Sequence, residues 1–331
     1  MKKDSIKIKV LVLSILIIVS ACKEQSSIEQ NENNKATEKT ELIIFHAGSL
    51  SVPFKEVSEK FEKENPNIKV ILESAGSRQC ARKITDLNRE CDIMASADYT
   101  VIDKLLIPDF ADWNIKFATN EMAIVYTKDS RYNNEINKDN WFNILLKNDV
   151  AYGRSEPDSD PCGYRTVLTT KLAENYYKQK GLTSILLEKD KNYIRPKEVD
   201  LLGLLESNAI DYIFLYRSVA EQHGLKYIIL PDEINLKNPD YSELYSTVNV
   251  EVSGKKPGEY IVKKGEAMVY GITIIKNAPN KNAAQKFVDY LLDKEKGMKI
   301  IESNGQPSII PTYSETYNMI PAELKKYSKN E

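Results

Sequence analysis

Short apolar runs alternate with longer amphipathic segments from about Glu41 onward, and this alternation constrains the fold more than any other feature. Phe54, Val57 and Phe61 recur on one face of the first amphipathic segment. The pattern predicts strands at 42–45, 70–72 and 92–95, with helices at 51–64 and 79–88 between them. This β-α-β-α-β order is typical of a parallel sheet in an α/β fold.

The alternation continues to the last third of the chain. It predicts further strands at 122–127, 150–152, 212–216, 227–230 and 267–275, and further helices at 163–177, 197–205, 282–292 and 295–302. The C-terminal run YSKNE is predicted to be frayed. The most economical arrangement is two α/β lobes joined by crossing strands. We expect residues 41–125 and 269–331 in lobe 1, residues 126–268 in lobe 2, and a ligand in the cleft between them.

The N-terminus has the composition of a secretory signal. Four lysines within the first nine residues precede an apolar run from Val10 to Val19, which is shorter than the roughly 20 residues that a membrane-spanning helix needs. The run ends in Val-Ser-Ala-Cys22, which resembles the lipobox of bacterial lipoproteins. We therefore expect residues 1–21 to be a lipoprotein signal peptide and Cys22 to carry lipid. The alternative is an ordinary signal peptide with an unmodified cysteine.

Residues 22–40 are polar and almost free of apolar side chains, so they are expected to form a flexible tether. The formal net charge of the whole chain is -2, which argues against nucleic-acid binding. Two histidines and no CxxC pattern argue against a zinc or iron site. Cys80 and Cys91 are close enough in sequence to form a disulfide; the alternative is that both are small buried groups.

Four junctions between a loop and a predicted helix have the residues of an anion site. Small residues and helix N-termini let unpaired backbone N–H groups approach an oxyanion closely. Taken alone, Ser49 or Ser77 is more often a helix N-cap than a ligand contact. The four junctions are residues 46–50 (HAGSL), 74–77 (SAGS), 158–165 (DSDPCGYR) and 195–200 (RPKEVD).

The runs FHAGSL, DPCGYR, RPKEVDLL and AIDYIFLYRSVAEQHGL resemble those of archaeal-type tungstate/molybdate-binding proteins, from Leu42 to about Pro311. These proteins are the substrate-binding components of ABC importers. The resemblance implies a two-lobed periplasmic-binding-protein fold of type II, no catalysis and no cofactor. It also implies a monomer on the outer face of the cytoplasmic membrane, which delivers tungstate or molybdate to a permease and its ATPase.

The resemblance also implies the ligand-binding residues. Asp160 and Glu198 would bind the tungsten or molybdenum atom itself, and Tyr216 would donate its hydroxyl proton to an oxygen of the anion. The full implied set is Gly48, Ser49, Ser77, Asp160, Pro161, Cys162, Glu198 and Tyr216, with the backbone contributing at Pro161 and Cys162.

Carboxylates beside a dianion require a physical reason, because like charges repel and uncompensated buried charge is unfavourable. Tungsten and molybdenum can expand their coordination shells and accept carboxylate oxygens, whereas sulfur stays tetrahedral. Such a site would exclude sulfate by repulsion. The alternatives are that Asp160 only caps a helix, that Glu198 only complements a helix dipole, and that Tyr216 is a core aromatic. Arg165 and Arg217 are expected near the site without contacting the anion.

Three rival functions remain open. The protein could bind another cargo, such as sulfate, phosphate, chromate or a ferric complex. It could hydrolyse phosphate or sulfate esters, although the sequence shows no GxSxG motif and no recognisable nucleophile with its base. It could also be a sensor lipoprotein that binds the oxyanion and transfers nothing.

Overall fold

The computed structural model describes residues 39–256 and 258–330. The predicted signal peptide, Cys22 and the predicted tether up to residue 38 lie outside these ranges. The first strand begins at Thr40, the last residue assigned to the tether. Within the described ranges, no helix combines the length and the apolar character needed to cross a bilayer.

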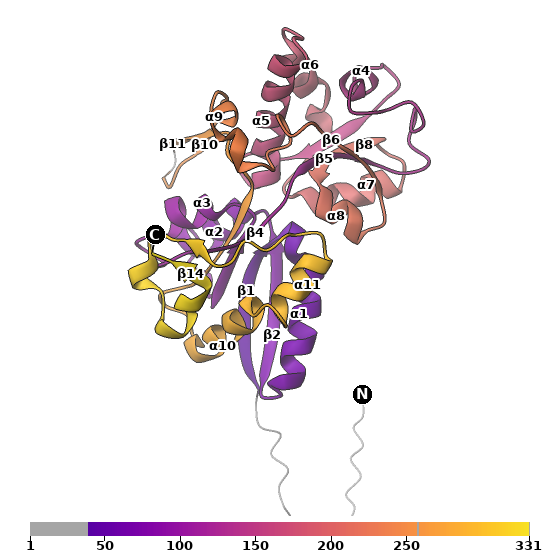
Figure 1. The fold of residues 1–331 in the computed structure, drawn as a ribbon. Coiled ribbons are helices and arrows are strands. Elements are labelled where there is room, and N and C mark those ends of the chain that lie inside the picture. Colours follow the sequence, from indigo (N-terminus) through magenta and orange to yellow (C-terminus); the bar gives the residue numbers. More distant parts are fainter. Residues whose placement is uncertain (1–38, 257, 331) are drawn as a thin grey trace, which may run out of the picture. The chain divides into compact units, whose positions relative to one another are not determined.

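The first of two five-stranded sheets has the order β2-β1-β3-β12-β4, and Figure 1 labels its strands β1, β2 and β4. Strands β1, β2 and β3 are parallel, and β12 runs antiparallel to both β3 and β4. The first three match the predicted β-α-β-α-β unit, and β12 returns from the last third of the chain. The bounds are β1 Thr40–Ala47, β2 Ile68–Ala75, β3 Ile93–Ser96, β4 Ile115–Thr119 and β12 Val269–Ile274.

Helices cover both faces of this sheet because successive residues of β1 point to opposite sides. Leu42 and Ile44 pack in one core with Phe54 of α1, whereas Phe45 packs in another with Cys80 of α2. Figure 1 shows α1 beside α11. The helices of this lobe are α1 Ser51–Glu64, α2 Ser77–Thr85, α3 Tyr99–Val101 with a π-helical turn Ile102–Leu106, α10 Lys281–Leu292 and α11 Gly297–Ser303.

The second sheet has the order β7-β6-β8-β5-β9. Strands β6, β7 and β8 are parallel, and β5 is antiparallel to β8 and β9. Its strands are β5 Met122–Tyr126, β6 Tyr152–Ser155, β7 Ile194–Arg195, β8 Tyr212–Tyr216 and β9 Lys226–Ile229. Its helices are α4 Trp141–Leu145, α5 Pro161–Tyr176, α6 Leu182–Lys189, α7 Leu202–Glu206, α8 Arg217–Gln222 and α9 Ser242–Tyr245.

The chain passes from the first sheet to the second at Asn120 and Glu121, between β4 and β5. Strand β5 therefore pairs in the second sheet, although the sequence placed residues up to 125 in lobe 1. Before the return to β12, an antiparallel hairpin of β10 (Asn249–Ser253) and β11 (Tyr260–Lys264) lies near α2 and α3 (Figure 1). The apolar pattern of the sequence does not predict this hairpin. We call the elements around the first sheet lobe 1, and those around the second sheet with the hairpin lobe 2.

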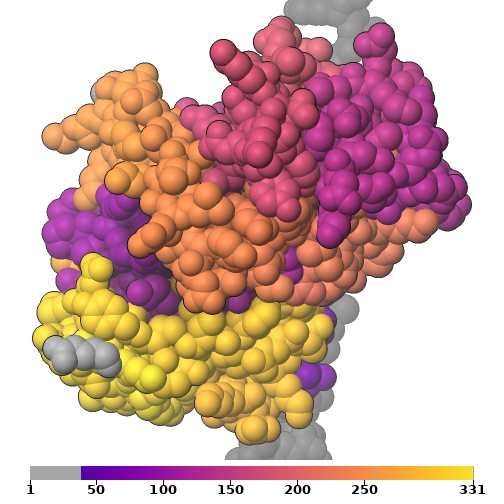
Figure 2. Space-filling view, turned by 45° about the horizontal axis from the view of Figure 1, so that its top comes forward, coloured from indigo at the N-terminus to yellow at the C-terminus, as the bar shows by residue number. Residues whose placement is uncertain are grey.

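The structure contradicts two local predictions and decides between the two alternatives for Cys80 and Cys91. Residues 197–205 are not one α-helix, because a 3-10 helix (Glu198–Leu201) precedes α7. The run YSKNE is not frayed in its described part: β14 (Ser328–Lys329) pairs with β13 (Thr312–Tyr313), and Figure 2 shows the yellow C-terminal segment packed along one face of the molecule. Cys80 and Cys91 are both free and buried, so they form no disulfide and are the small buried groups of the alternative interpretation.

Candidate functional site

The candidate residues from both lobes follow the C-terminal ends of parallel strands. In lobe 1, Gly48 and Ser49 follow β1, and Ser77 follows β2. In lobe 2, the loops after β6 and β7 carry Asp160 and Glu198, and Tyr216 is the last residue of β8. Ligands of open α/β sheets bind outside this edge, where helix N-termini present backbone N–H groups.

The two lobes touch at two glycines of lobe 1. A Cβ atom on Gly48 would lie 2.9 Å from Oε2 and 3.0 Å from Oε1 of Glu198. A Cβ atom on Gly76 would lie 2.4 Å from the carbonyl oxygen of Ser159 and 3.0 Å from Cβ of Asp160. Any larger residue would separate the lobes at these points, so both glycines are needed for this close approach.

Asp160 caps a helix, as the alternative interpretation held, and also holds a second loop of the site. Its Oδ1 accepts a hydrogen bond from the Cys162 N–H at 3.2 Å, which caps α5 with Pro161 as the first helical residue. Its Oδ2 accepts from the Glu198 N–H at 2.8 Å. Burial raises the pKa of Asp160 in spite of these bonds. Asp160 therefore fixes the backbone position of Glu198.

Glu198 is a completely buried acid that lies beside the Asp160 carboxyl. Its side chain is 0 % exposed, and neither carboxylate oxygen accepts a hydrogen bond from any residue that the structure describes. Burial raises the pKa of Glu198 well above its ordinary value, and the neighbouring Asp160 carboxyl raises it further. A glutamate that only complemented a helix dipole would not need such burial, and an orphaned buried carboxylate of this kind requires an explanation.

Three buried hydroxyls of the site each accept a hydrogen bond. Ser77 Oγ accepts from the Ala97 N–H at 2.9 Å, and Ser49 Oγ accepts from the Tyr270 hydroxyl at 3.0 Å. The Tyr216 hydroxyl accepts from Nη1 of Arg165 at 3.0 Å. No residue in the described ranges accepts a hydrogen bond from these three hydroxyls, so all three protons are free to be donated to a ligand.

A buried cluster of charged side chains, Asp98, Lys263 and Arg165, was not predicted from the sequence. Asp98, in the loop after β3, bonds to the Tyr164 hydroxyl and, at 2.6 Å, to Nζ of Lys263 in β11. Burial acts to raise the pKa of Asp98, but the Lys263 ammonium and the Arg165 guanidinium hold it well below its usual range. The loop follows the third parallel strand, so the strand-end rule that selected the other loops could have found it.

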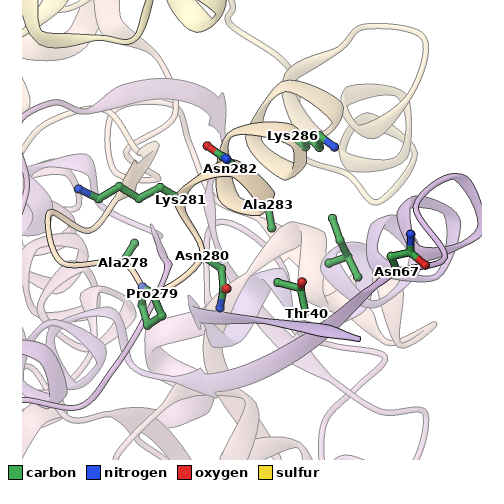
Figure 3. Close-up of a pocket in the computed structure, with 10 residues that line it drawn as sticks. Thr40, Asn67, Ala278, Pro279, Asn280, Lys281, Asn282, Ala283 and Lys286 are labelled. Atoms are coloured by element: carbon green, nitrogen blue, oxygen red, sulfur yellow. The ribbon is translucent and has the colours of Figure 1, made fainter. Parts of the chain in front are cut away.

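A cavity of about 570 Å³ lies elsewhere, beside Thr40, Ile68 and the start of α10. These residues are at the N-terminal ends of β1 and β2, whereas the candidate site follows their C-terminal ends. An eight-residue strand spans roughly 25 Å. In Figure 3 the ammonium groups of Lys281 and Lys286 point in different directions, so they form no joint anion site there.

Replacing Glu198 by glutamine tests the burial of its carboxylate without any ligand. Because the folded-state pKa lies above the unfolded value, the folded protein binds the extra proton, and stability falls as pH rises from about 4.5 toward the folded pKa. A buried unsatisfied group costs about 1–3 kcal/mol. We therefore expect Glu198→Gln to raise Tm by several degrees at pH 8 and to change it little at pH 4.5. Equal shifts at both pH values would contradict this assignment.

Comparison with known proteins places these features in a family. A family model described as bacterial extracellular solute-binding protein matches residues 42–306. An uncharacterized solute-binding protein of Petrotoga mobilis is 50% identical over 291 residues, covering 87% of this chain and 90% of the relative. The molybdate/tungstate-binding protein WtpA of Pyrococcus abyssi is 40% identical over 346 residues, covering 96% and 97% of the two chains.

Solved structures show the same two-lobed fold at low sequence identity. The periplasmic molybdate-binding protein of Azotobacter vinelandii matches with a TM-score of 0.58 and 16% identity, covering 82% of this chain and all of that chain. The sulfate-binding protein SubI of Mycobacterium tuberculosis gives 0.59 and 13%, covering 82% and 88%. From the family match and the near full-length relatives, the chain belongs to the bacterial extracellular solute-binding proteins.

Proposed function

We propose that this protein binds tungstate or molybdate between its two lobes, with Asp160 and Glu198 as ligands of the metal atom. The observation that carries this proposal is the Glu198 carboxylate, which is 0 % exposed and accepts no hydrogen bond from the described residues. Bonding to the metal atom of an oxyanion would satisfy these oxygens. The 40%-identical relatives named molybdate/tungstate-binding protein WtpA support the same cargo.

The donors around the two acids suit the oxygens of the same anion. Ser49 and Ser77 from lobe 1 and Tyr216 from lobe 2 all have hydroxyl protons available. The N-terminus of α2 has no side-chain cap; its Gln79 N–H donates to the Ser159 carbonyl oxygen at 3.0 Å, and no described residue accepts from the N–H groups of Ser77 and Arg78, which are available to an anion. We therefore assign donors to the oxygens of the anion and carboxylates to its metal atom.

The two acids also favour tungstate and molybdate over sulfate. Both have pKa values raised by burial, so ionising them beside a second anion is unfavourable unless they bond to it. Sulfur accepts no further oxygen ligand, and sulfate therefore meets only the repulsion. The phosphorus of phosphate and the small chromium atom of chromate likewise stay four-coordinate, whereas the larger tungsten and molybdenum atoms can accept further oxygens.

The serines lack the surroundings of a hydrolase nucleophile. Ser49 Oγ accepts from a tyrosine and Ser77 Oγ from a backbone N–H, and neither donates to a basic side chain among the described residues. A serine nucleophile needs an adjacent general base. His46 does not fill this role: burial lowers its pKa to about 4, and its Nδ1 lies 2.8 Å from the Ala47 carbonyl. A binding protein without catalysis therefore fits this site better than an ester hydrolase.

We further propose that the cargo is delivered to an ABC permease with its ATPase, and that lipid on Cys22 holds a monomeric protein at the outer face of the cytoplasmic membrane. The extracellular family supports a site of action outside the cytoplasm. The sequence around Cys22 and the polar stretch after it support the anchor. A sensor role would leave the binding site the same but require no permease.

Titration calorimetry of the full chain in detergent tests the cargo and the two acids together. We expect tight binding of tungstate and molybdate, and no binding of sulfate or phosphate. Asp160→Asn and Glu198→Gln should each weaken tungstate binding at least about 100-fold, equal to about 2.7 kcal/mol. The same two variants should gain affinity for sulfate, because each removes a repulsive carboxylate.

The matched control is Asp200→Asn. Asp200 lies two residues after Glu198 in the same 3-10 helix, but its side chain is 37% exposed and pairs with Lys197 at 3.6 Å. This variant should bind tungstate like the unaltered chain. Equal binding of sulfate and tungstate, or undiminished tungstate binding by the Asp160 and Glu198 variants, would refute metal ligation.

The anchor has its own test. Mass spectrometry of the protein extracted from membranes should find residues 1–21 removed and Cys22 acylated. Cys22→Ser should release the protein from the membrane fraction, because the lipid chain supplies the membrane affinity. An unmodified cysteine in membrane-extracted protein would rule out the lipoprotein assignment and leave the cargo assignment untouched.

A further inference from the structure

Arg165 joins the two lobes through a single nitrogen atom. It lies in α5 of lobe 2 and is 3% exposed. Its Nη1 donates to the Tyr216 hydroxyl at 3.0 Å, within the same lobe, and to the carbonyl oxygen of Ala97 at 2.7 Å, in lobe 1. The bond to Ala97 requires the two lobes to be in contact.

The chemistry of these groups fixes the direction of each bond. A guanidinium has only donors, so the Tyr216 oxygen must accept from Arg165, and the Tyr216 proton is left for another acceptor. The N–H of the same Ala97 donates to Ser77 Oγ at 2.9 Å, which leaves the Ser77 proton for another acceptor too. Ala97 is thus linked to one hydroxyl of each lobe. Its N–H donates to Ser77 of lobe 1, and its carbonyl oxygen accepts from Arg165, which also donates to Tyr216 of lobe 2.

We infer that Arg165 is a positioning residue, which on closure of the lobes fixes the Tyr216 hydroxyl as a donor to the bound anion. This inference rests on the proposed binding of an oxyanion at this site. The positive charge of Arg165 alone would not fix the direction in which the Tyr216 hydroxyl donates. Because the Ser77 and Tyr216 hydroxyls then both donate, the site prefers an anion whose oxygens only accept hydrogen bonds over an anion that carries its own O–H group.

The charge of Arg165 is already balanced inside the protein. Burial would lower its pKa, but the Tyr216 and Asp98 oxygens raise it, so the guanidinium stays charged. Asp98 also bonds to Lys263, and both side chains are almost fully buried. Asp98 thus faces two cations, Arg165 and Lys263, and what Arg165 alone contributes is the direction of its N–H bonds to Tyr216 and Ala97.

A double-mutant cycle on the full chain separates this role from a general structural one. Tungstate affinity is measured for the unaltered chain, Arg165→Met, Tyr216→Phe and the double variant, with Arg165→Lys as a charge-conserving variant. Arg131→Met is the matched control, since Arg131 bonds to Asp211 in the same lobe at 2.8 and 2.6 Å and lies outside the site. Thermal unfolding without ligand reports the stability of every variant.

We expect Arg165→Met and Tyr216→Phe each to weaken binding at least about tenfold, and the double variant to bind no more weakly than the weaker single one. Arg165→Lys should also lose affinity, because a lysine keeps the charge but not the planar donor geometry. Arg131→Met should change Tm without changing affinity. Independent, multiplicative losses in the double variant, or full affinity in Arg165→Lys, would overturn the inference.

The proposed function and this inference fail in different ways. If the unaltered chain binds sulfate or phosphate instead of tungstate or molybdate, the proposed cargo is wrong. The same cycle with that anion then decides the role of Arg165. A chain that binds none of these oxyanions overturns both.

Discussion

The hydrogen bond from the Glu198 N–H to Oδ2 of Asp160 is the interaction on which the rest of the site depends. It holds two acids in adjacent loops, and each acid is at least 99% buried. Two carboxylates so close together, both with raised pKa values, are unfavourable in an isolated fold. A ligand that bonds to both carboxylates at the contact between the lobes would offset this cost.

The architecture explains how residues so distant in sequence meet there. Parallel strands in both sheets end at the contact between the lobes, and each strand end is followed by a helix N-terminus. Lobe 1 contributes glycines and serines, which permit close approach and donate hydrogen bonds. Lobe 2 contributes the acids and Tyr216. The proposed donors are divided between the lobes, Ser49 and Ser77 in lobe 1 and Tyr216 in lobe 2, so binding and closure are expected to be coupled.

Much of the fold was predictable because its signals are local. The apolar runs of β1, β2 and β3 and the apolar face of α1 appear directly in the sequence. The β10–β11 hairpin was missed because β11 lacks the polar and apolar alternation of a half-buried strand: its apolar residues Tyr260 and Val262 face solvent and are 70% and 50% exposed. The C-terminal strand β14 was missed because it has only two residues and depends on pairing with β13.

The loops that form the candidate site were predictable from the sequence, but the hydrogen bonds between their side chains were not. The resemblance to a family indicated the acids, and the structure brings them together with the expected glycines and serines. Asp98 bonds to Tyr164 of α5 and Tyr270 of β12 bonds to Ser49, over separations of 66 and 221 residues that no local pattern reveals. Arg165 was expected near the site; its bond to the Ala97 carbonyl depends on how the two lobes meet.

X-ray absorption spectroscopy at the tungsten edge, on the protein loaded with tungstate, tests the central claim most directly, because it counts the atoms bound to the metal. We predict six oxygen neighbours, four from the anion and one each from Asp160 and Glu198, and a return toward four when both acids are replaced by their amides. Four-coordinate tungsten in the unaltered protein would contradict direct ligation and leave an oxyanion held by hydrogen bonds alone.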